Sequence, residues 1–303
     1  MTEKRGMARL AAAAGRRLRR LRVRGIPRVL YLSAPFIIGR GLKTLPTAVG
    51  VQLSLDVADY FSCMMFYGRF APDIVAVLNQ LVRPGDSVID VGAQLGYITS
   101  QLAVLVGAQG HVQSFEPDPN ALPRLRTAVE ANDLRCVKIF PFAASDRDAD
   151  LSFNVSPMLG WSTAVNGTHH GDLPKVAVRG VRIDSLVDAG EIARPVKLVK
   201  IDVEGFEVAV LDGMQTLLAS DHPYLVMEIN PLMLQPGGFT SVDVLARVAK
   251  HGYRIYRIDE APGIFRGGDI QLTPLNPLDE LDFCDVLCVP EGRPLPRARL
   301  ATR

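Results

Sequence analysis

A chain of 303 residues with 48% hydrophobic and 22% charged residues is long enough to bury one large core. Its formal charge of +2 hides two basic ends, because residues 1–43 carry 12 Lys or Arg against one acid and residues 291–303 carry four against one. The body between them, residues 44–290, has 18 basic and 30 acidic residues, which argues against a nucleic-acid partner because a phosphate backbone needs a basic track. We therefore expect a basic N-terminal segment, one main domain and a basic Pro/Arg tail.

The first predicted element is basic and then apolar. Residues 15–25 read GRRLRRLRVRG, and they precede an apolar run of about eleven residues at 29–39. That run is too short to span a bilayer, which takes about twenty residues. A basic helix lying on an anionic membrane surface is one interpretation, and a signal peptide or a solvated extension are others. We expect a cytoplasmic protein, with membrane association through this segment as the alternative.

From residue 71 onward, apolar runs of strand length alternate with helical patterns, which is typical of a parallel sheet covered by helices. Two further strands, 253–258 and 283–289, have no obvious crossover helix between them, so we expect an antiparallel pair at the sheet edge. Ligands of such sheets bind at the carboxyl ends of the strands. The other predicted strands are residues 87–91, 111–116, 137–143, 196–203 and 224–229, and the predicted helices are residues 97–106, 120–132, 206–218 and 242–250.

A glycine turn, DVGAQLG, follows the first of these strands. It lacks the middle glycine of the GxGxxG dinucleotide fingerprint, which argues against a pyrophosphate at this turn. Gly92 and Gly96 would allow a ligand close to the backbone, and Asp90 would orient the turn or meet an ammonium group. Glu116 ends the next strand, where a carboxylate can accept from both ribose hydroxyls. A ribose, a cationic amino-acid part and no phosphate describe S-adenosylmethionine.

Two other interpretations of the turn stay open. A nicotinamide cofactor would need the turn to accept a pyrophosphate. A simple strand-to-helix turn, with Glu116 solvated at the end of its strand, would need no ligand.

Four stretches, DSVIDVGAQLGYIT, SFEPDPNALPRLRTAVEAND, FAASD and KLVKIDVEGFEVAVLDG, resemble the FkbM family of S-adenosylmethionine-dependent methyltransferases over about residues 84–230. The resemblance implies the class I methyltransferase fold, an α/β, Rossmann-like, mostly parallel sheet with helices on both faces and an antiparallel edge strand. It places Ser145 and Asp146 near the adenine, although a turn that caps local backbone explains them equally well. The cofactor-binding residues that we expect are Asp90, Gly92, Ala93, Gly96, Glu116, Ser145, Asp146 and Asp202.

The stretch KIDVEGFE supplies the expected catalytic groups. Strand alternation would put Lys200, Asp202 and Glu204 on one face, which is costly on a buried strand without a task or mutual pairing. We interpret Asp202 and Glu204 as carboxylates facing the acceptor, with Lys200 as a pairing partner or oxygen-binding cation. Glu228 ends the following strand and adds a further carboxylate. A structural ion-pair network of Lys200 with Glu204 or Glu207 is the alternative.

Those carboxylates have two chemical uses. One of them could receive the proton that a hydroxyl acceptor must lose. Two or three of them could instead hold a divalent cation such as Mg²⁺, which prefers oxygen ligands. His169 and His170, in a polar loop, could cover the site, and Trp161 could stack on a sugar. Surface histidines and a buried tryptophan without a role are the alternatives.

The acceptor is inferred mainly from the resemblance. The Asn/Asp-Pro-Pro-aromatic stretch of adenine or amide N-methyltransferases is absent, which again argues against nucleic acid. FkbM-like enzymes are associated with O-methylation, so we expect a small-molecule carbohydrate or glycolipid hydroxyl as acceptor, with a polyketide-type metabolite as the alternative. A nicotinamide-dependent oxidoreductase and a non-catalytic, membrane-associated protein are further alternatives. The non-catalytic protein would be marked by loss of the acids at the strand ends, and these are all present.

Overall fold

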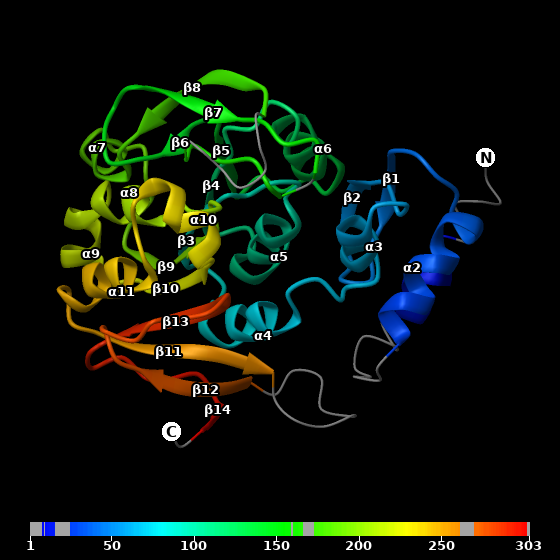
Figure 1. Ribbon diagram of the computed structural model, residues 1–303. Coiled ribbons are helices and arrows are strands. Elements are labelled where there is room, and N and C mark those ends of the chain that lie inside the picture. Colours follow the sequence, from blue (N-terminus) through cyan, green and yellow to red (C-terminus); the bar gives the residue numbers. More distant parts are fainter. Residues whose placement is uncertain are drawn as a thin grey trace.

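The computed structural model describes residues 8, 10–15, 25–158, 160–165, 173–260 and 270–301. Within these residues, one large sheet has the strand order β14-β12-β11-β13-β10-β9-β3-β4-β5 (Figure 1). Its strands are β3 (Ser87–Val91), β4 (His111–Phe115), β5 (Val137–Phe140), β9 (Val196–Ile201), β10 (Tyr224–Ile229), β11 (Tyr253–Glu260), β12 (Ile270–Leu275), β13 (Cys284–Pro290) and β14 (Ala298–Leu300).

Strands β10, β9, β3, β4 and β5 are parallel to one another. Strand β13 lies between β10 and β11 and is antiparallel to both. Parallel neighbours need crossover connections, and helices occupy the segments that link them. This order, with one antiparallel strand inserted beside the parallel set, is the class I methyltransferase fold, which confirms the fold class expected from the sequence.

Both faces of the sheet are buried, because successive residues of a strand point to opposite sides. Val88 belongs to one hydrophobic cluster, and its neighbour Ile89 belongs to the other. Helices α4, α5 and α6 contribute to the first cluster, and α7, α8, α9 and α11 to the second (Figure 1). The bounds are α4 (Pro72–Leu81), α5 (Tyr97–Val106), α6 (Leu122–Ala131), α7 (Ile183–Asp188), α8 (Glu207–Asp212), α9 (Gln215–Asp221) and α11 (Ser241–Ala249).

Smaller elements extend this core. Arg124 of α6 donates two hydrogen bonds, of 3.0 and 2.7 Å, to the Ser54 carbonyl of the hairpin β1–β2. The hairpin therefore stands against α6, and α3 packs on it (Figure 1). These elements are α2 (Ile26–Ile37), β1 (Lys43–Pro46), β2 (Gln52–Leu55), α3 (Tyr60–Phe66), the three-stranded sheet of β6 (Ala143–Ala144), β7 (Asp150–Asn154) and β8 (Lys175–Val181), α10 (Pro231–Leu234) and the 3-10 turn η1 (Gln235–Gly237).

Two predicted segments are divided in the structure. The strand expected at 137–143 stops at Phe140, and Ala143–Ala144 pairs instead with β8. The helix expected at 206–218 is broken at Gly213, where a Cβ atom would lie 1.8 Å from the Ser145 carbonyl oxygen. Both breaks follow from packing at the three-stranded sheet of β6, β7 and β8. A local sequence pattern carries no information about such a contact, because the partners are distant in the chain.

The last part of the sheet is larger than expected. The antiparallel pairing of the two last predicted strands, now β11 and β13, is confirmed. However, β12 and β14 extend the sheet beyond β11, so the pair is internal. Since β14 (Ala298–Leu300) pairs with β12, part of the basic tail belongs to the sheet. The division into residues 1–43, 44–290 and 291–303 stays a proposal.

Candidate active site

A cavity of about 1020 Å³ opens at the carboxyl ends of β3, β9 and β10. The glycine turn and Glu116 line one part of it, and the strand-end acids line another. Helices α3 and α4, the loop around residues 153–162 and helix α10 complete the wall. Of the residues expected from the sequence, the wall includes Gly92, Ala93, Glu116, Lys200, Asp202, Glu204 and Glu228.

The glycine turn is fixed by close packing. Gly92 has a φ of 80°, and a Cβ atom there would lie 1.8 Å from the Asp202 carbonyl oxygen. Only glycine fits such a contact at a positive φ. The N–H groups of Gly92 and Ala93 both donate to the Phe115 carbonyl at 3.0 Å, and that of Gln94 donates to Glu116 at 2.7 Å. Three successive N–H groups are thus used inside the protein, which disfavours the pyrophosphate of a nicotinamide cofactor here.

Glu116 is held rigidly at the cavity wall. Its Oε2 accepts from the Gln94 N–H at 2.7 Å and its Oε1 accepts from the Asp118 N–H at 2.8 Å. Only 5% of the residue is exposed, and burial raises the pKa of Glu116 to about 7 although both hydrogen bonds lower it. Each carboxylate oxygen retains a lone pair, so the group can still accept hydrogen bonds from a ligand.

A buried charged pair lies under the turn. Lys200 Nζ is 3.7 Å from Asp90 Oδ1 and 3.2 Å from Asp202 Oδ2, and it donates to the Gly92 carbonyl at 3.2 Å. Thr99 Oγ1 donates to Asp90 Oδ2 at 2.6 Å. Burial raises the pKa of the Asp90 carboxyl, although the charge of Lys200 opposes this. Burial lowers the pKa of Lys200, but the charges of Asp202 and Asp90 outweigh it, so the pKa is raised overall and the ammonium form persists.

This pairing differs from the ion-pair alternative, in which Lys200 was expected to meet Glu204 or Glu207. The partners are instead Asp90 and Asp202, because β3 and β9 are neighbours and Asp90 stands in register with Lys200. Asp90 is fully buried and lies behind the cavity wall rather than in it. Its expected direct contact with the cofactor stays a prediction.

The acidic turn after β9 is not an extension of the strand. Strand β9 ends at Ile201, and Glu204 has a φ of 53°, so strand alternation does not place Glu204. The buried Glu207 holds the turn, since its Oε1 accepts from the N–H of Gly205 at 3.1 Å and from that of Val203 at 3.4 Å. Thr163 Oγ1 donates to the Glu204 carbonyl at 2.8 Å. The turn, rather than the pleat, therefore brings Glu204 to the cavity.

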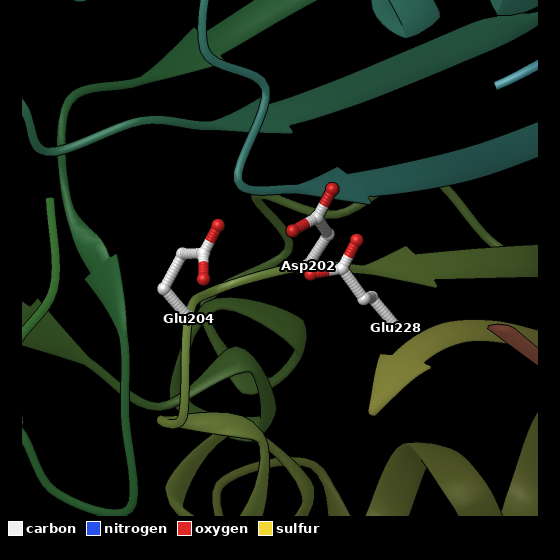
Figure 2. A group of neighbouring side chains, drawn as sticks. All are labelled: Asp202, Glu204 and Glu228. Carbon is white, nitrogen blue, oxygen red and sulfur yellow. The ribbon is translucent and has the colours of Figure 1, made fainter. Parts of the chain in front are cut away.

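Three carboxylates meet at the end of β9 and β10. One oxygen from each of Asp202, Glu204 and Glu228 lies within 4.8 Å of the others. Figure 2 shows Glu228 beside Asp202, with Glu204 reaching in from the turn. Burial, and then the charge of Asp202, raises the pKa of Glu204 to about 8 and that of Glu228 to about 10. Near neutral pH Glu228 therefore holds a proton, and Glu204 is only partly ionised.

A fourth acid of the site was not anticipated from the sequence. Asp285 of β13 is paired in register with Glu228 and lines the cavity, and burial raises its pKa to about 7. No motif surrounds it, and only the insertion of β13 beside β10 brings it to the other acids. Its position directly after Cys284 in an apolar run was the available signal, because an acid in a buried strand is costly.

The cavity also has an apolar rim that was not predicted from the sequence. It comes from α3, α4, α10, the loop before β13 and the loop around residue 158, which carry no sequence motif. Met158, Leu232 and Phe283 are 50%, 67% and 62% exposed and line the cavity. Trp161, singled out in the sequence, lines it as well. The further apolar members are Phe61, Met65, Phe70, Ile74 and Met233.

The remaining expected residues lie outside the main cavity wall. Gly96 begins α5 and packs on α6, where a Cβ atom would lie 2.8 Å from Leu125 Cδ1. Ser145 Oγ donates to Asp146 Oδ1 at 3.1 Å, and Asp146 also accepts from Arg147. These bonds join side chains to one another rather than to the backbone, and both the capping role and a contact with adenine stay predictions. His169 and His170 fall outside the described residues.

The family model described as "Methyltransferase FkbM domain" matches residues 90–255, more than half of the chain. The chain belongs to the FkbM methyltransferase family. This confirms the resemblance, and the matched residues contain the glycine turn, Glu116 and the three clustered carboxylates. Asp285 and the wall residues of α3 and α4 lie outside the match.

Two curated relatives are similar over parts of the chain. Hexuronic acid methyltransferase AglP of Haloferax volcanii is 31% identical over 165 residues, which cover 54% of this chain and 63% of the relative. A protein-L-isoaspartate O-methyltransferase of Methanocella arvoryzae is 35% identical over 72 residues, 23% of this chain and 38% of that protein. The chain thus spans less than two thirds of the length of either relative.

Solved structures are more distant. The FkbM methyltransferase of Methylobacillus flagellatus overlaps with a TM-score of 0.42 at 14% identity, covering 75% of this chain and 54% of that one. Aeropyrum pernix fibrillarin overlaps with a TM-score of 0.38 at 13% identity, covering 71% and 74%. The strand order, rather than these overlaps, carries the fold assignment. Among the described residues, no helix is long and apolar enough to cross a membrane.

Proposed function

We propose that this FkbM-family protein is an S-adenosylmethionine-dependent O-methyltransferase that acts on a hydroxyl of a carbohydrate or glycolipid. One observation supports the proposal. A single cavity is lined by the glycine turn, by Glu116 in the position expected to bind a ribose, and by a cluster of acids with raised pKa values. The first part suits the cofactor and the second suits a hydroxyl acceptor. Contact of the basic N-terminal segment with a membrane belongs to the same proposal.

Cofactor binding in this proposal uses the turn and Glu116. Glu116 accepts hydrogen bonds from the ribose hydroxyls, while Gly92 and Ala93 let the methionyl part pass close to the backbone. The expected roles of Asp90, Gly96, Ser145 and Asp146 remain those implied by the family resemblance.

The chemistry requires one proton acceptor. The acceptor oxygen attacks the methyl carbon, the carbon–sulfur bond breaks, and sulfur keeps that electron pair to give S-adenosylhomocysteine. The hydroxyl proton passes to a carboxylate as the new C–O bond forms. Glu204 in its ionised form is suited to receive it, because a pKa of about 8 makes it a stronger base than an ordinary carboxylate and leaves a fraction ionised near neutral pH. Glu228, whose pKa is raised to about 10, already carries a proton and can donate a hydrogen bond. Lys200 stays cationic and holds Asp202 in place.

A divalent cation is the second use of the same acids. Asp202, Glu204 and Glu228 each present an oxygen within 4.8 Å of the others, which fits the oxygen ligands that Mg²⁺ prefers. A bound cation would hold a sugar diol and lower the pKa of its hydroxyl. Methyl transfer in EDTA and with added Mg²⁺ separates this use from a metal-free base.

The acceptor is a carbohydrate in this proposal because the relative from Haloferax volcanii is named a hexuronic acid methyltransferase. The apolar rim adds that the acceptor carries an apolar portion beside its hydroxyl, as a glycolipid does. A uronic acid would place its carboxylate near several acids, so we expect neutral sugars to be preferred unless a cation is bound. A polyketide-type metabolite is the second candidate, and the same apolar rim favours it.

The first experiment is calorimetric titration with S-adenosylhomocysteine and, separately, with NADH. We expect binding of the former, weakened at least ten-fold by Glu116→Ala through loss of the ribose contact. Binding of NADH alone would support an oxidoreductase, and binding of neither would support a non-catalytic protein.

The catalytic assignment is tested by Asp202→Asn and Glu204→Gln in an acceptor screen. Each change should lower turnover at least ten-fold while S-adenosylhomocysteine affinity stays within a few-fold, because the acids face the acceptor. Asp150→Asn, which alters an exposed carboxylate that does not line the cavity, is the matched control. Unchanged turnover in both variants would move the base or metal role to Glu228 or Asp285.

A further inference from the structure

Helix α2 (Ile26–Ile37) turns an apolar face outward. Val29, Leu32 and Phe36 are 65%, 57% and 84% exposed, and their spacing of three and four residues puts them on one side of the helix. The opposite side is buried through Leu30 and Ala34. The helix is therefore fixed to the protein by one face while a second apolar face meets solvent.

The inner face of α2 is anchored to α3. Tyr31 donates from its hydroxyl to the Ala58 carbonyl at 3.1 Å, and its ring meets that of Tyr60 at 5.5 Å between centroids. These contacts set the rotation of the helix, so the outward position of Phe36 follows from packing. An exposed apolar face on a fixed helix marks an interaction surface.

Positive charge lies at both ends of helix α2. Arg28 and Arg40 are exposed at its two ends, and the sequence just before the helix, residues 16–24, contains six arginines. The body of the protein, residues 44–290, is acidic. An anionic surface would attract the α2 end and repel the remainder, which defines one orientation.

We propose that the α2 face, Val29, Leu32, Phe36 and Ile37, is the surface by which the protein rests on an anionic phospholipid bilayer. An apolar stripe flanked by arginines is the pattern of an interfacial helix, whose apolar side enters the headgroup boundary while its basic groups meet lipid phosphates. A helix of 12 residues cannot span the bilayer, so it lies along the surface.

The inner face of α2 is linked to the cavity by aromatic packing, which begins at the contact of Tyr31 with Tyr60. The ring of Tyr60 meets that of Phe61 at 5.9 Å, and Phe61 meets Phe70 at 6.2 Å. Phe61 and Phe70 line the cavity. This step rests on the proposed function. A lipid-linked acceptor held in the membrane at α2 would lie near a row of apolar side chains that leads from this helix to the cavity.

The test is co-sedimentation of the full chain with vesicles of phosphatidylcholine alone and of phosphatidylcholine with equal phosphatidylglycerol. We expect binding to the anionic vesicles that salt weakens. The double change Leu32→Ser and Phe36→Ser should lower the partition coefficient about ten-fold, because it removes most of the apolar area that enters the lipid. Leu278→Ser, which alters a residue 80% exposed in the loop between β12 and β13, is the matched control and should bind as the parent does.

Equal binding of the double variant and the parent would overturn the proposal, as would equal binding to the two kinds of vesicle. Light scattering without lipid tests whether a second copy of the chain covers this face instead. If the parent is a dimer, the double variant is a monomer and neither binds vesicles, the face belongs to a dimer interface and the proposal is overturned. S-adenosylhomocysteine titration of the double variant should match the parent. Vesicle binding that persists when no methyl transfer is found would leave the membrane surface standing without the proposed activity.

Discussion

Replacing Gly92 by alanine tests the close contact between the glycine turn and Asp202, at the end of β9. The residue has a φ of 80°, and a Cβ atom would stand 1.8 Å from the Asp202 carbonyl oxygen and 2.9 Å from its carbonyl carbon. The left-handed backbone alone costs an alanine about 1–2 kcal/mol. Forcing the end of β9 away from the turn adds about 1–3 kcal/mol, as for an overpacked core.

Gly85 supplies the matched control. It has a φ of 88°, but nothing lies within 4 Å of the position of its Cβ. Gly85→Ala should therefore lose about 1–2 kcal/mol, the backbone cost alone, whereas Gly92→Ala should lose about 2–5 kcal/mol. Urea unfolding of both variants gives these values, and calorimetry should show S-adenosylhomocysteine affinity lowered at least ten-fold only in Gly92→Ala, because the turn lines the cavity.

Equal losses in the two variants would refute this reasoning, because they would mean that the end of β9 moves aside without cost. Retained ligand affinity in Gly92→Ala would mean that the ligand does not pass against this turn.

Two further predictions concern charge. Because burial raises the pKa of Glu116 to about 7, its ionised fraction grows from about one tenth at pH 6 to about nine tenths at pH 8, so S-adenosylhomocysteine affinity should rise about ten-fold over that range. Glu116→Gln should bind weakly at both values, and an equal rise in that variant would assign the titration to another group. Lys200→Met removes the cation that Asp90 faces in the core and should lower the unfolding free energy by about 3–5 kcal/mol. Adding Asp90→Asn should restore part of that loss, and a double variant as unstable as the single one would show that Asp90 does not depend on Lys200.

The same raised pKa of Glu116 has a cost for the unliganded protein. Its ordinary value is 4.5 and its folded value is about 7, so the folded state binds more protons than the unfolded state between those two values. Stability from this group is therefore present at low pH and is lost as pH rises towards 7. A ligand that hydrogen-bonds to the carboxylate compensates for that loss.

The parallel strands could be predicted because burial on both faces leaves nearly continuous apolar runs between helical patterns. Strand β3, with every residue buried, is the clearest example. The strands β12 and β14 were not predicted, since their pairing depends on partners far along the chain. The divided helix at Gly213 was missed for the same reason, because the atom that requires glycine there belongs to Ser145.

The residues of the site also divide into those that the sequence predicts and those that only the fold brings together. Sequence alone determined the glycine turn, Glu116 and the acids after β9 and β10, because a tight turn and a strand end leave local signatures of one or two residues. Only the tertiary structure decided that Lys200 pairs with Asp90, that a left-handed turn held by Glu207 delivers Glu204, and that Asp285 joins the acids. These are contacts between strands distant in sequence, and register and packing fix them rather than any local pattern.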